Sequence, residues 1–320
     1  MRFSRHLAWI VGLALAAGPA VAGSVWVASQ QGARATRIER PEGARVAEVG
    51  AALAVAPSPA VVAAGPGGRL YLSHPDGRAV TAIAADGTTR HWPVPGQPFG
   101  LAADPDGRFL YVGDWSGNRV LRLSVETGAV EAEVAVGRDP AGLALGANGR
   151  LYVAEREGRS VGVVDTARMV RIAGIPVGEG PFALAYDPVR DRVYVANVRS
   201  NDLTVIDAGA LKPIATVPVG ASPYGVAISP DGRCVVVTNQ HAGTVSIADA
   251  DTLTVTATVP VGRYPEGVAI LGDRAYVANW FSDDVSIIDL ATLKEMGRIP
   301  VAEGPRTLVA DQPALGETGR

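Results

Sequence analysis

Cysteine is nearly absent from this chain of 320 residues, which contains only Cys234. One cysteine cannot form an intramolecular disulfide, and at the start of a β-branched segment a buried, unreactive thiol is the ordinary interpretation. The pattern Cys-x-x-Cys-His, through which c-type haem is attached, does not occur. Covalent c-type haem is therefore excluded.

Local catalytic motifs are missing as well. The sequence has no Gly-rich phosphate loop, no nucleophile elbow, no His-Glu-x-x-His and no EF-hand loop. His91 and His241 have no partner at a metal-ligand spacing. Any site must then be assembled from residues that are distant in the sequence.

Basic runs are also absent. The formal net charge is −3, and removal of Arg2 and Arg5 with a leader peptide changes it to −5. Because neutralisation of phosphates supplies most of the affinity for nucleic acids, this balance disfavours a generic nucleic-acid partner. We expect the protein to be a monomer.

Long hydrophobic runs are confined to the N-terminus. Arg2 and Arg5 precede an apolar stretch at 7–17, and Ala-Val-Ala at 20–22 is a typical cleavage site. The stretch is short for a spanning helix, which needs about 20 residues. We predict a signal peptide at 1–22, with an uncleaved anchor as the alternative. The mature chain would then lack a transmembrane segment and be periplasmic or secreted.

A repeat of about 40–45 residues dominates the rest of the chain. The segment Val-Tyr-Val-Ala-Asn at 193–197 recurs in similar forms, and their central residues are Trp26, Tyr71, Tyr111, Tyr152, Tyr194, Val236 and Tyr276. The unit at 223–262 contains four short β-branched strands separated by turns such as Pro-Asp-Gly at 230–232. This pattern is typical of an all-β repeat protein.

The first strand of each unit begins at a proline, in the series Pro59, Pro98, Pro140, Pro181, Pro223, Pro265 and Pro305. The second-strand series begins earlier, at Trp26, so the two series are out of phase. We therefore predict a seven-bladed β-propeller of four-stranded antiparallel blades over residues 23–311. The last strand, from Pro305, would complete one blade with three N-terminal strands at 24–30, 33–40 and 45–55. Residues 312–320 are expected to form a flexible tail.

The second-strand segments Val-Val-Val-Thr-Asn (235–239) and Val-Tyr-Val-Ala-Asn (193–197), and the Pro-Val-Gly before several blades, resemble the YVTN β-propeller repeat family over about residues 24–310. The resemblance implies a propeller outside the cytoplasm, and some members of the family bind ligands or proteins at the ring face. It implies no common reaction and supplies no catalytic residues, so the fold does not settle the function.

Two sets of equivalent positions are expected to surround the central channel on one face. The first is the end of each second strand, comprising Ser29, His74, Asp114, Glu155, Asn197, Asn239 and Asn279. His74, Asp114 and Glu155 depart from Asn in three consecutive blades. A histidine and two carboxylates suit a divalent metal or acid–base chemistry. The alternative is that each residue caps its own turn, as Asn does.

The second set follows each first-strand proline and comprises Ala60, Phe99, Ala141, Phe182, Tyr224, Glu266 and Arg306. Glu266 and Arg306 are neighbours in this set and are expected to pair. Loops on the same face carry Trp115, Arg156, Arg199, His241, Trp280 and Phe281. Aromatic and arginine residues that converge on a concavity are typical of binding sites and interfaces. The alternative for Phe99 and Phe182 is that they plug the channel as core residues.

Three functions are compatible with these observations. The leading hypothesis is a binding or scaffold propeller that holds a protein or small ligand on this face. The second is a metal-assisted lactonase or lyase that uses His74, Asp114 and Glu155. The third, by fold analogy alone, is a propeller subunit of a periplasmic dehydrogenase with a quinone-type cofactor.

Overall fold

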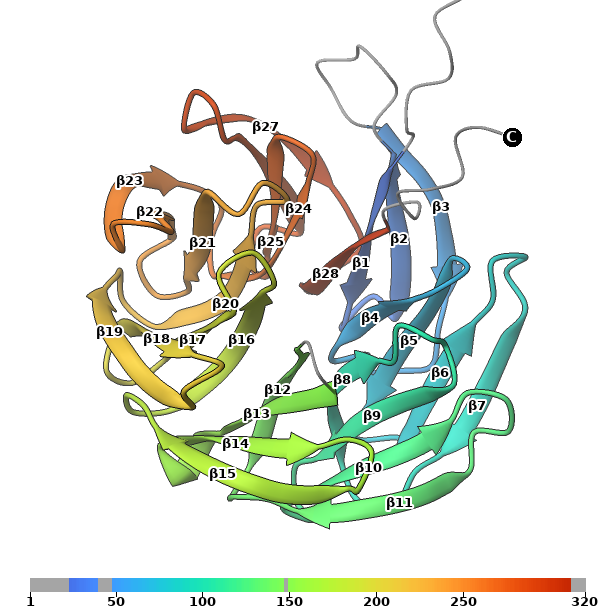
Figure 1. Ribbon diagram of the computed structural model, residues 1–320. Coiled ribbons are helices and arrows are strands. Elements are labelled where there is room, and N and C mark those ends of the chain that lie inside the picture. Colours follow the sequence, from blue (N-terminus) through green and yellow to red (C-terminus); the bar gives the residue numbers. More distant parts are fainter. Residues whose placement is uncertain (1–22, 40–47, 147–148, 312–320) are drawn as a thin grey trace, which may run out of the picture.

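The computed structural model describes residues 23–39, 48–146 and 149–311. It contains seven four-stranded antiparallel sheets arranged in a ring (Figure 1). The predicted all-β, seven-bladed propeller is therefore confirmed. The predicted signal peptide and the predicted tail at 312–320 lie outside the described residues. Within the described part of the chain, no helix has the length and apolar character needed to cross a membrane.

The first three blades follow one another along the chain, each with its first strand innermost. Blade 1 contains β4 (Val62–Gly65), β5 (Arg69–His74), β6 (Ala79–Ile83) and β7 (Thr89–Pro93). Blade 2 contains β8 (Pro98–Ala103), β9 (Phe109–Asp114), β10 (Arg119–Ser124) and β11 (Val130–Ala135). Blade 3 contains β12 (Pro140–Leu145), β13 (Arg150–Glu155), β14 (Ser160–Asp165) and β15 (Val170–Pro176), with the single turn η2 (Arg156–Gly158) after β13.

The next three blades repeat the same order. Blade 4 contains β16 (Pro181–Asp187), β17 (Arg192–Asn197), β18 (Asp202–Asp207) and β19 (Lys212–Pro218). Blade 5 contains β20 (Pro223–Ile228), β21 (Cys234–Asn239), β22 (Thr244–Asp249) and β23 (Thr254–Pro260). Blade 6 contains β24 (Pro265–Leu271), β25 (Arg274–Asn279), β26 (Asp284–Asp289) and β27 (Lys294–Pro300).

Blade 7 joins the two ends of the chain. Its strand order is β28-β1-β2-β3, from β28 (Pro305–Asp311), β1 (Ser24–Ser29), β2 (Arg34–Glu39) and β3 (Glu48–Ala54). In the antiparallel pair of β28 and β1, Trp26 lies opposite Val309. Figure 1 shows the last strand beside the first ones, red next to blue. The closure predicted from the two out-of-phase series is confirmed.

The core lies between the blades rather than in one central cluster. Second strands are buried along nearly their whole length, and Tyr71, Tyr152, Tyr194 and Tyr276 are among the largest fully buried side chains. One cluster joins Tyr276 of blade 6 to Val25 of blade 7, so the closing blade is held by side-chain packing as well as by strand pairing. Each blade therefore stabilises its neighbours.

The innermost strands approach one another closely because several carry glycine after the Pro-x start. A Cβ at Gly100 would lie 2.1 Å from the carbonyl oxygen of Ala141 in the next blade, and one at Gly267 would lie 2.7 Å from that of Arg306. Real Cβ atoms do not approach backbone this closely, so glycine allows the inner ring to contract. This contraction brings the residues at position x close together.

Deletion of residues 303–320 removes β28, exposes the inner edge of β1 and opens the ring. We expect loss of the cooperative thermal transition, or aggregation through the exposed edge. Differential scanning calorimetry of the truncated chain tests this expectation. Deletion of 312–320 alone leaves β28 in place and serves as the control, with an expected Tm equal to that of the full chain. A cooperative transition at that same Tm in the longer deletion would contradict the proposed role of the closure.

Candidate functional site

A cavity of about 500 Å³ lies at the centre of the face where first strands begin and second strands end, called here the ring face. Two repeat positions build it. The position after each first-strand proline contributes Phe99, Phe182, Tyr224, Glu266 and Arg306. The residue directly after each second strand contributes Gln30, Pro75, Trp115, Arg156, Val198 and Gln240. Seven of the eleven ring-face residues proposed from the sequence therefore line one cavity.

Aromatic rings form the floor of this cavity. The ring centroids of Phe182 and Tyr224 are 4.1 Å apart, those of Phe99 and Phe182 are 5.7 Å apart, and those of Phe99 and Trp115 are 5.0 Å apart. A second, more apolar cavity of about 420 Å³ lies along the innermost strands, and Phe99, Phe182 and Tyr224 line both cavities. These three rings separate the two cavities, so they plug the channel and also face the site.

Arg306, near the start of β28, connects residues from several blades at this floor. Its guanidinium donates hydrogen bonds to Gln30 Oε1 (2.7 Å) and to the Tyr224 hydroxyl (3.0 Å). Its Cζ also lies 5.4 Å from the Phe99 ring centroid and 5.8 Å from that of Trp280. These distances are within the range of cation–π attraction. Arg306, from the last strand, is therefore fixed by Gln30 near the N-terminus and by Tyr224 of blade 5.

Glu266 forms the predicted pair with Arg306, with 3.4 Å between Oε2 and Nε. The residue is only 5% exposed, and its Oε1 accepts a hydrogen bond of 2.9 Å from Gln240. Its Oε2 has no hydrogen-bond partner among the described residues. Burial raises the pKa of Glu266 to about 7, although Arg306 and Gln240 act to lower it. This carboxyl group therefore changes charge near neutral pH.

Arg156 is the other arginine in the cavity, and its guanidinium lies 5.7 Å from the Trp115 ring centroid and 5.8 Å from that of Phe182. Its Nε is buried without a hydrogen-bond partner, and no carboxylate within the described part of the chain pairs with it. A half-buried cation with no counter-charge, placed over two aromatic rings, can accept the anionic group of a ligand.

The remaining ring-face candidates divide into two groups. Trp280 contacts Arg306, and Phe281, which is 53% exposed, packs on Tyr264 at 4.8 Å between centroids. His241 is exposed and also contacts Tyr264, at 5.7 Å. Of these residues only Tyr264 lines the cavity, and Trp280, Phe281 and His241 do not. Arg199 does not line the cavity, because its guanidinium pairs with Glu157.

The other predicted ring, the last residue of each second strand, is buried within the sheets. Ser29, His74, Asp114, Glu155, Asn197, Asn239 and Asn279 are all 0–1% exposed. The side chains of His74, Asp114, Glu155 and Asn239 bond the loop that enters their own blade. Those of Asn197 and Asn279 bond only the following strand, and Ser29 Oγ has no partner among the described residues. Asn239, for example, accepts a hydrogen bond from the Gly220 N–H and donates to Ser246 Oγ. This corrects the expectation that these side chains face the channel.

His74, Asp114 and Glu155 follow the same capping pattern, each with partners at its own blade. His74 bonds the Pro57 carbonyl and Thr81, Asp114 bonds Arg119 and the Gln97 N–H, and Glu155 holds both Nε and Nη2 of Arg171. No group of three or more His, Cys, Asp or Glu residues within 23–39, 48–146 and 149–311 could hold a metal ion. The structure does not bring these three residues together as a ligand set.

Several cavity residues escaped the sequence analysis. Gln30 and Gln240 occupy the same repeat position as Trp115 and Arg156, but amides at a turn carry no distinctive signal. Tyr264 carries none either, because its left-handed φ of 59° is a feature of the repeat that recurs before the first-strand proline at Ser58, Asp139 and Ser222.

The fold and the site define the class of this protein, which is a seven-bladed β-propeller with a polar and aromatic cavity at one end of its channel. The chain belongs to the Virginiamycin B lyase family, whose sequence profile matches residues 11–289. No curated protein matches the chain.

Solved structures resemble it at low sequence identity. Hydrazine synthase of Kuenenia stuttgartiensis is 20% identical with a TM-score of 0.70, covering 80% of this chain and 96% of that one. A functionally unknown protein of Desulfotomaculum acetoxidans is 13% identical with a TM-score of 0.78, covering 91% and 99%. Virginiamycin B lyase of Staphylococcus aureus is 13% identical with a TM-score of 0.68, covering 76% and 84%. These likenesses establish the fold alone.

Because the strand-end residues are structural, substitution there should affect stability and leave the ring-face cavity intact. Glu155→Gln replaces an acceptor that is 1% exposed with an amide and leaves Arg171 without its partner. We expect a loss of about 2 kcal/mol, typical of a hydrogen bond to a charged group, because only Glu155 of the pair is buried, and a Tm lower by a few degrees. Thermal unfolding measures it, with Glu133→Gln, on an exposed carboxylate, as the control. An unchanged Tm would contradict the capping role.

Proposed function

We propose that this protein is a binding module whose ring-face cavity holds a ligand, or a segment of a partner protein, that carries an anionic group beside a flat apolar group. The observation that supports this most directly is the unpaired guanidinium of Arg156 above Trp115 and Phe182. The secretory leader expected from the sequence supports a place of action outside the cytoplasm.

The charges of the cavity agree with an anionic ligand. Arg156 and Arg306 contribute two positive charges, and the lining also carries two carboxyl groups, the buried Glu266 and the exposed Asp76. Below pH 7 Glu266 is largely protonated, so that Arg306 is also free to attract an anion. Tyr224 remains neutral, because burial raises the pKa of its phenol far above the ordinary value.

An aromatic carboxylate such as 2-naphthoate is a suitable probe for this site. We expect wild-type protein to bind it saturably and Arg156→Ala to bind it about tenfold more weakly, since the charge-assisted bond is lost. Isothermal titration calorimetry measures both. Arg168→Ala is the control, because Arg168 is exposed at a turn between third and fourth strands, on the face opposite the ring face. Equal affinity in Arg156→Ala and wild type would refute the proposal.

The pH dependence gives a second readout of the same prediction. The probe is anionic throughout pH 5.5–8.5, while Glu266 gains a negative charge as the pH rises through about 7. Affinity should therefore fall with rising pH, by roughly three- to tenfold. In Glu266→Gln this fall should disappear, and the affinity should stay near the low-pH value of the wild type.

A second candidate function is lyase chemistry, which the family membership and Glu266 together favour. A carboxyl group whose pKa lies near the working pH is suited to general acid–base catalysis. Glu266 would accept a proton from carbon in an elimination, while Arg306 and Arg156 stabilise the negative charge that develops on the substrate.

Incubation with virginiamycin B, followed by mass spectrometry, tests this second function. A lyase cleaves without adding water, so the summed mass of the products equals the mass of the substrate. We expect turnover by wild type and a loss of at least about 100-fold in Glu266→Gln. Undiminished turnover in Glu266→Gln would exclude Glu266 as the base, and no turnover by wild type would leave the binding function alone.

A further inference from the structure

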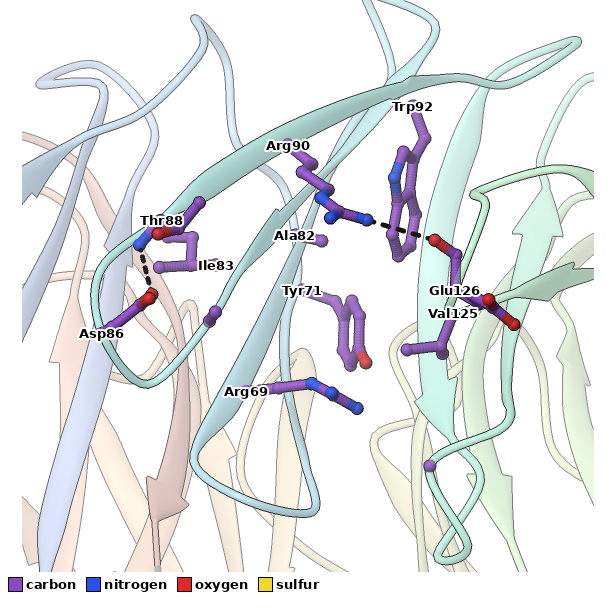
Figure 2. Close-up of a pocket in the computed structure, with 12 residues that line it drawn as sticks. Arg69, Tyr71, Ala82, Ile83, Asp86, Thr88, Arg90, Trp92, Val125 and Glu126 are labelled. Atoms are coloured by element: carbon purple, nitrogen blue, oxygen red, sulfur yellow. Dashed lines mark hydrogen bonds between the residues drawn. The ribbon is translucent and has the colours of Figure 1, made fainter.

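A separate cavity of about 450 Å³ lies between blades 1 and 2, at the ends of the strands remote from the ring face (Figure 2). Its lining comes from β5, β6, β7 and the turns near Gly107 and Glu126. None of its lining residues belongs to the ring-face cavity. The two cavities therefore open on opposite faces of the propeller.

The repeat shows what is different about this blade interface. At the next three blade interfaces along the chain, an arginine of one blade donates a hydrogen bond to the following blade. The acceptor is the backbone carbonyl of the residue directly after that blade's third strand, and the bond closes the space between the two blades. Arg122 donates to Thr166 O (3.2 Å), Arg150 to Ala208 O (2.6 Å) and Arg192 to Ala250 O (2.8 Å).

The equivalent carbonyl in blade 2 belongs to Val125, which follows β10. Arg69 occupies in blade 1 the position of Arg150 and Arg192, at the start of the second strand. No bond from Arg69 to this carbonyl is formed, and both residues line the cavity instead. The Arg69 guanidinium lies beside Tyr71 and is exposed to the cavity instead of closing the interface.

The strand pairing of blade 1 also differs from that of the other blades, in agreement with a cavity at its interface with blade 2. The pairing of its third and fourth strands, β6 and β7, is regular from Ala79 to Ile83. The same pairing contains a register shift in each of the other six blades of the described chain. A bulge bends and twists a strand, so an outer hairpin without one follows a different course.

Hydrogen-bond donors surround the centre of the cavity. Figure 2 shows Tyr71 between Arg69 and Arg90, with Trp92 alongside. Neither arginine forms an ion pair within the described chain, although Arg90 donates to the carbonyl of Glu126 at 3.1 Å. The Tyr71 hydroxyl is buried, and the Arg69 guanidinium lies beside it and acts to lower its pKa, against the rise that burial causes. A group of donors with no acceptor is complementary to an oxyanion.

The other walls of the cavity indicate the chemical character of the group that carries the oxyanion. Ala82, Ile83 and Val125 are apolar. The two acidic residues of the lining lie at its ends, where the Asp86 carboxylate accepts the Thr88 N–H within its own turn and the Glu126 side chain points away from Tyr71 (Figure 2). The centre is thus positively charged and flanked by apolar and aromatic surface.

We propose that the cavity between blades 1 and 2 is a second binding site, which takes a small carboxylate with a short, flat apolar body. The carboxylate lies between the exposed side chains of Arg69 and Arg90. The apolar body lies against Ile83 and Val125. This site does not depend on the function proposed for the ring-face cavity.

Benzoate is the probe for this site, and the indole N–H signals of the ¹⁵N-labelled full chain provide the readout. We expect the Trp92 signal to shift saturably with benzoate, and benzyl alcohol, which has the same ring without the charge, to produce no such shift. Arg69→Ala and Arg90→Ala should each weaken binding at least fivefold, with an unchanged Tm. Arg168→Ala should bind as wild type does.

The signals of Trp115 and Trp280 report the ring-face cavity separately, so failure at one site is distinguishable from failure at the other. No saturable shift of Trp92 with benzoate would overturn the proposal. An equal shift with benzyl alcohol would also overturn it, as would undiminished affinity in the double variant Arg69→Ala/Arg90→Ala.

Discussion

The pairing of β28 with β1 is the constraint on which the rest of the structure depends. Outside the inner ring each blade packs mainly on its two neighbours, so a ring without this pair has two unsatisfied strand edges and two exposed blade faces. The pair also completes the site, because Arg306 from the C-terminal strand meets Gln30 from the N-terminal segment at 2.7 Å. The ring-face cavity therefore exists only in the closed ring.

The last residue of each second strand and the residue after it have different roles, so the site can vary without loss of the fold. The last residue of four second strands bonds the entering loop, whether it is His74, Asp114, Glu155 or Asn239. The residue after it lies over the channel and has no partner that the fold requires. Glutamine, tryptophan, arginine and valine all occur there. Chemical differences between the blades can accumulate at this second position.

The pair of Glu266 and Arg306 shows how electrostatics connects structure with function. Burial of the carboxyl group opposes its ionisation more strongly than one arginine and one amide favour it, and its pKa rises to about 7. Such a balance contributes little to stability. Strongly perturbed ionisable groups in cavities are characteristic of functional sites. Here the perturbation arises because the contracted inner ring buries Glu266, and Arg306 at the equivalent position of the next blade offsets only part of the effect.

Much of the fold and part of the site could be predicted from the sequence. A period of about 40 residues and two out-of-phase series of tyrosines and prolines were enough to determine the blade number and the closure. Equivalent positions on adjacent blades correctly predicted the Glu266–Arg306 pair. His74, Asp114 and Glu155 were assigned to the channel, but the residue that follows each of them lines the cavity instead. The direction of a strand-end side chain depends on the loop groups that it meets in the folded blade.

The sequence by itself determined the architecture, since a repeated strand can bury its apolar faces only between copies of itself. Only the tertiary structure decided which polar residues remain available to a ligand. Arg69, Arg150 and Arg192 stand in nearly the same local sequence, each two residues before a second-strand tyrosine. Arg150 and Arg192 each close a blade interface, whereas Arg69 borders a cavity. The difference lies in how the neighbouring blades meet, which no local pattern encodes.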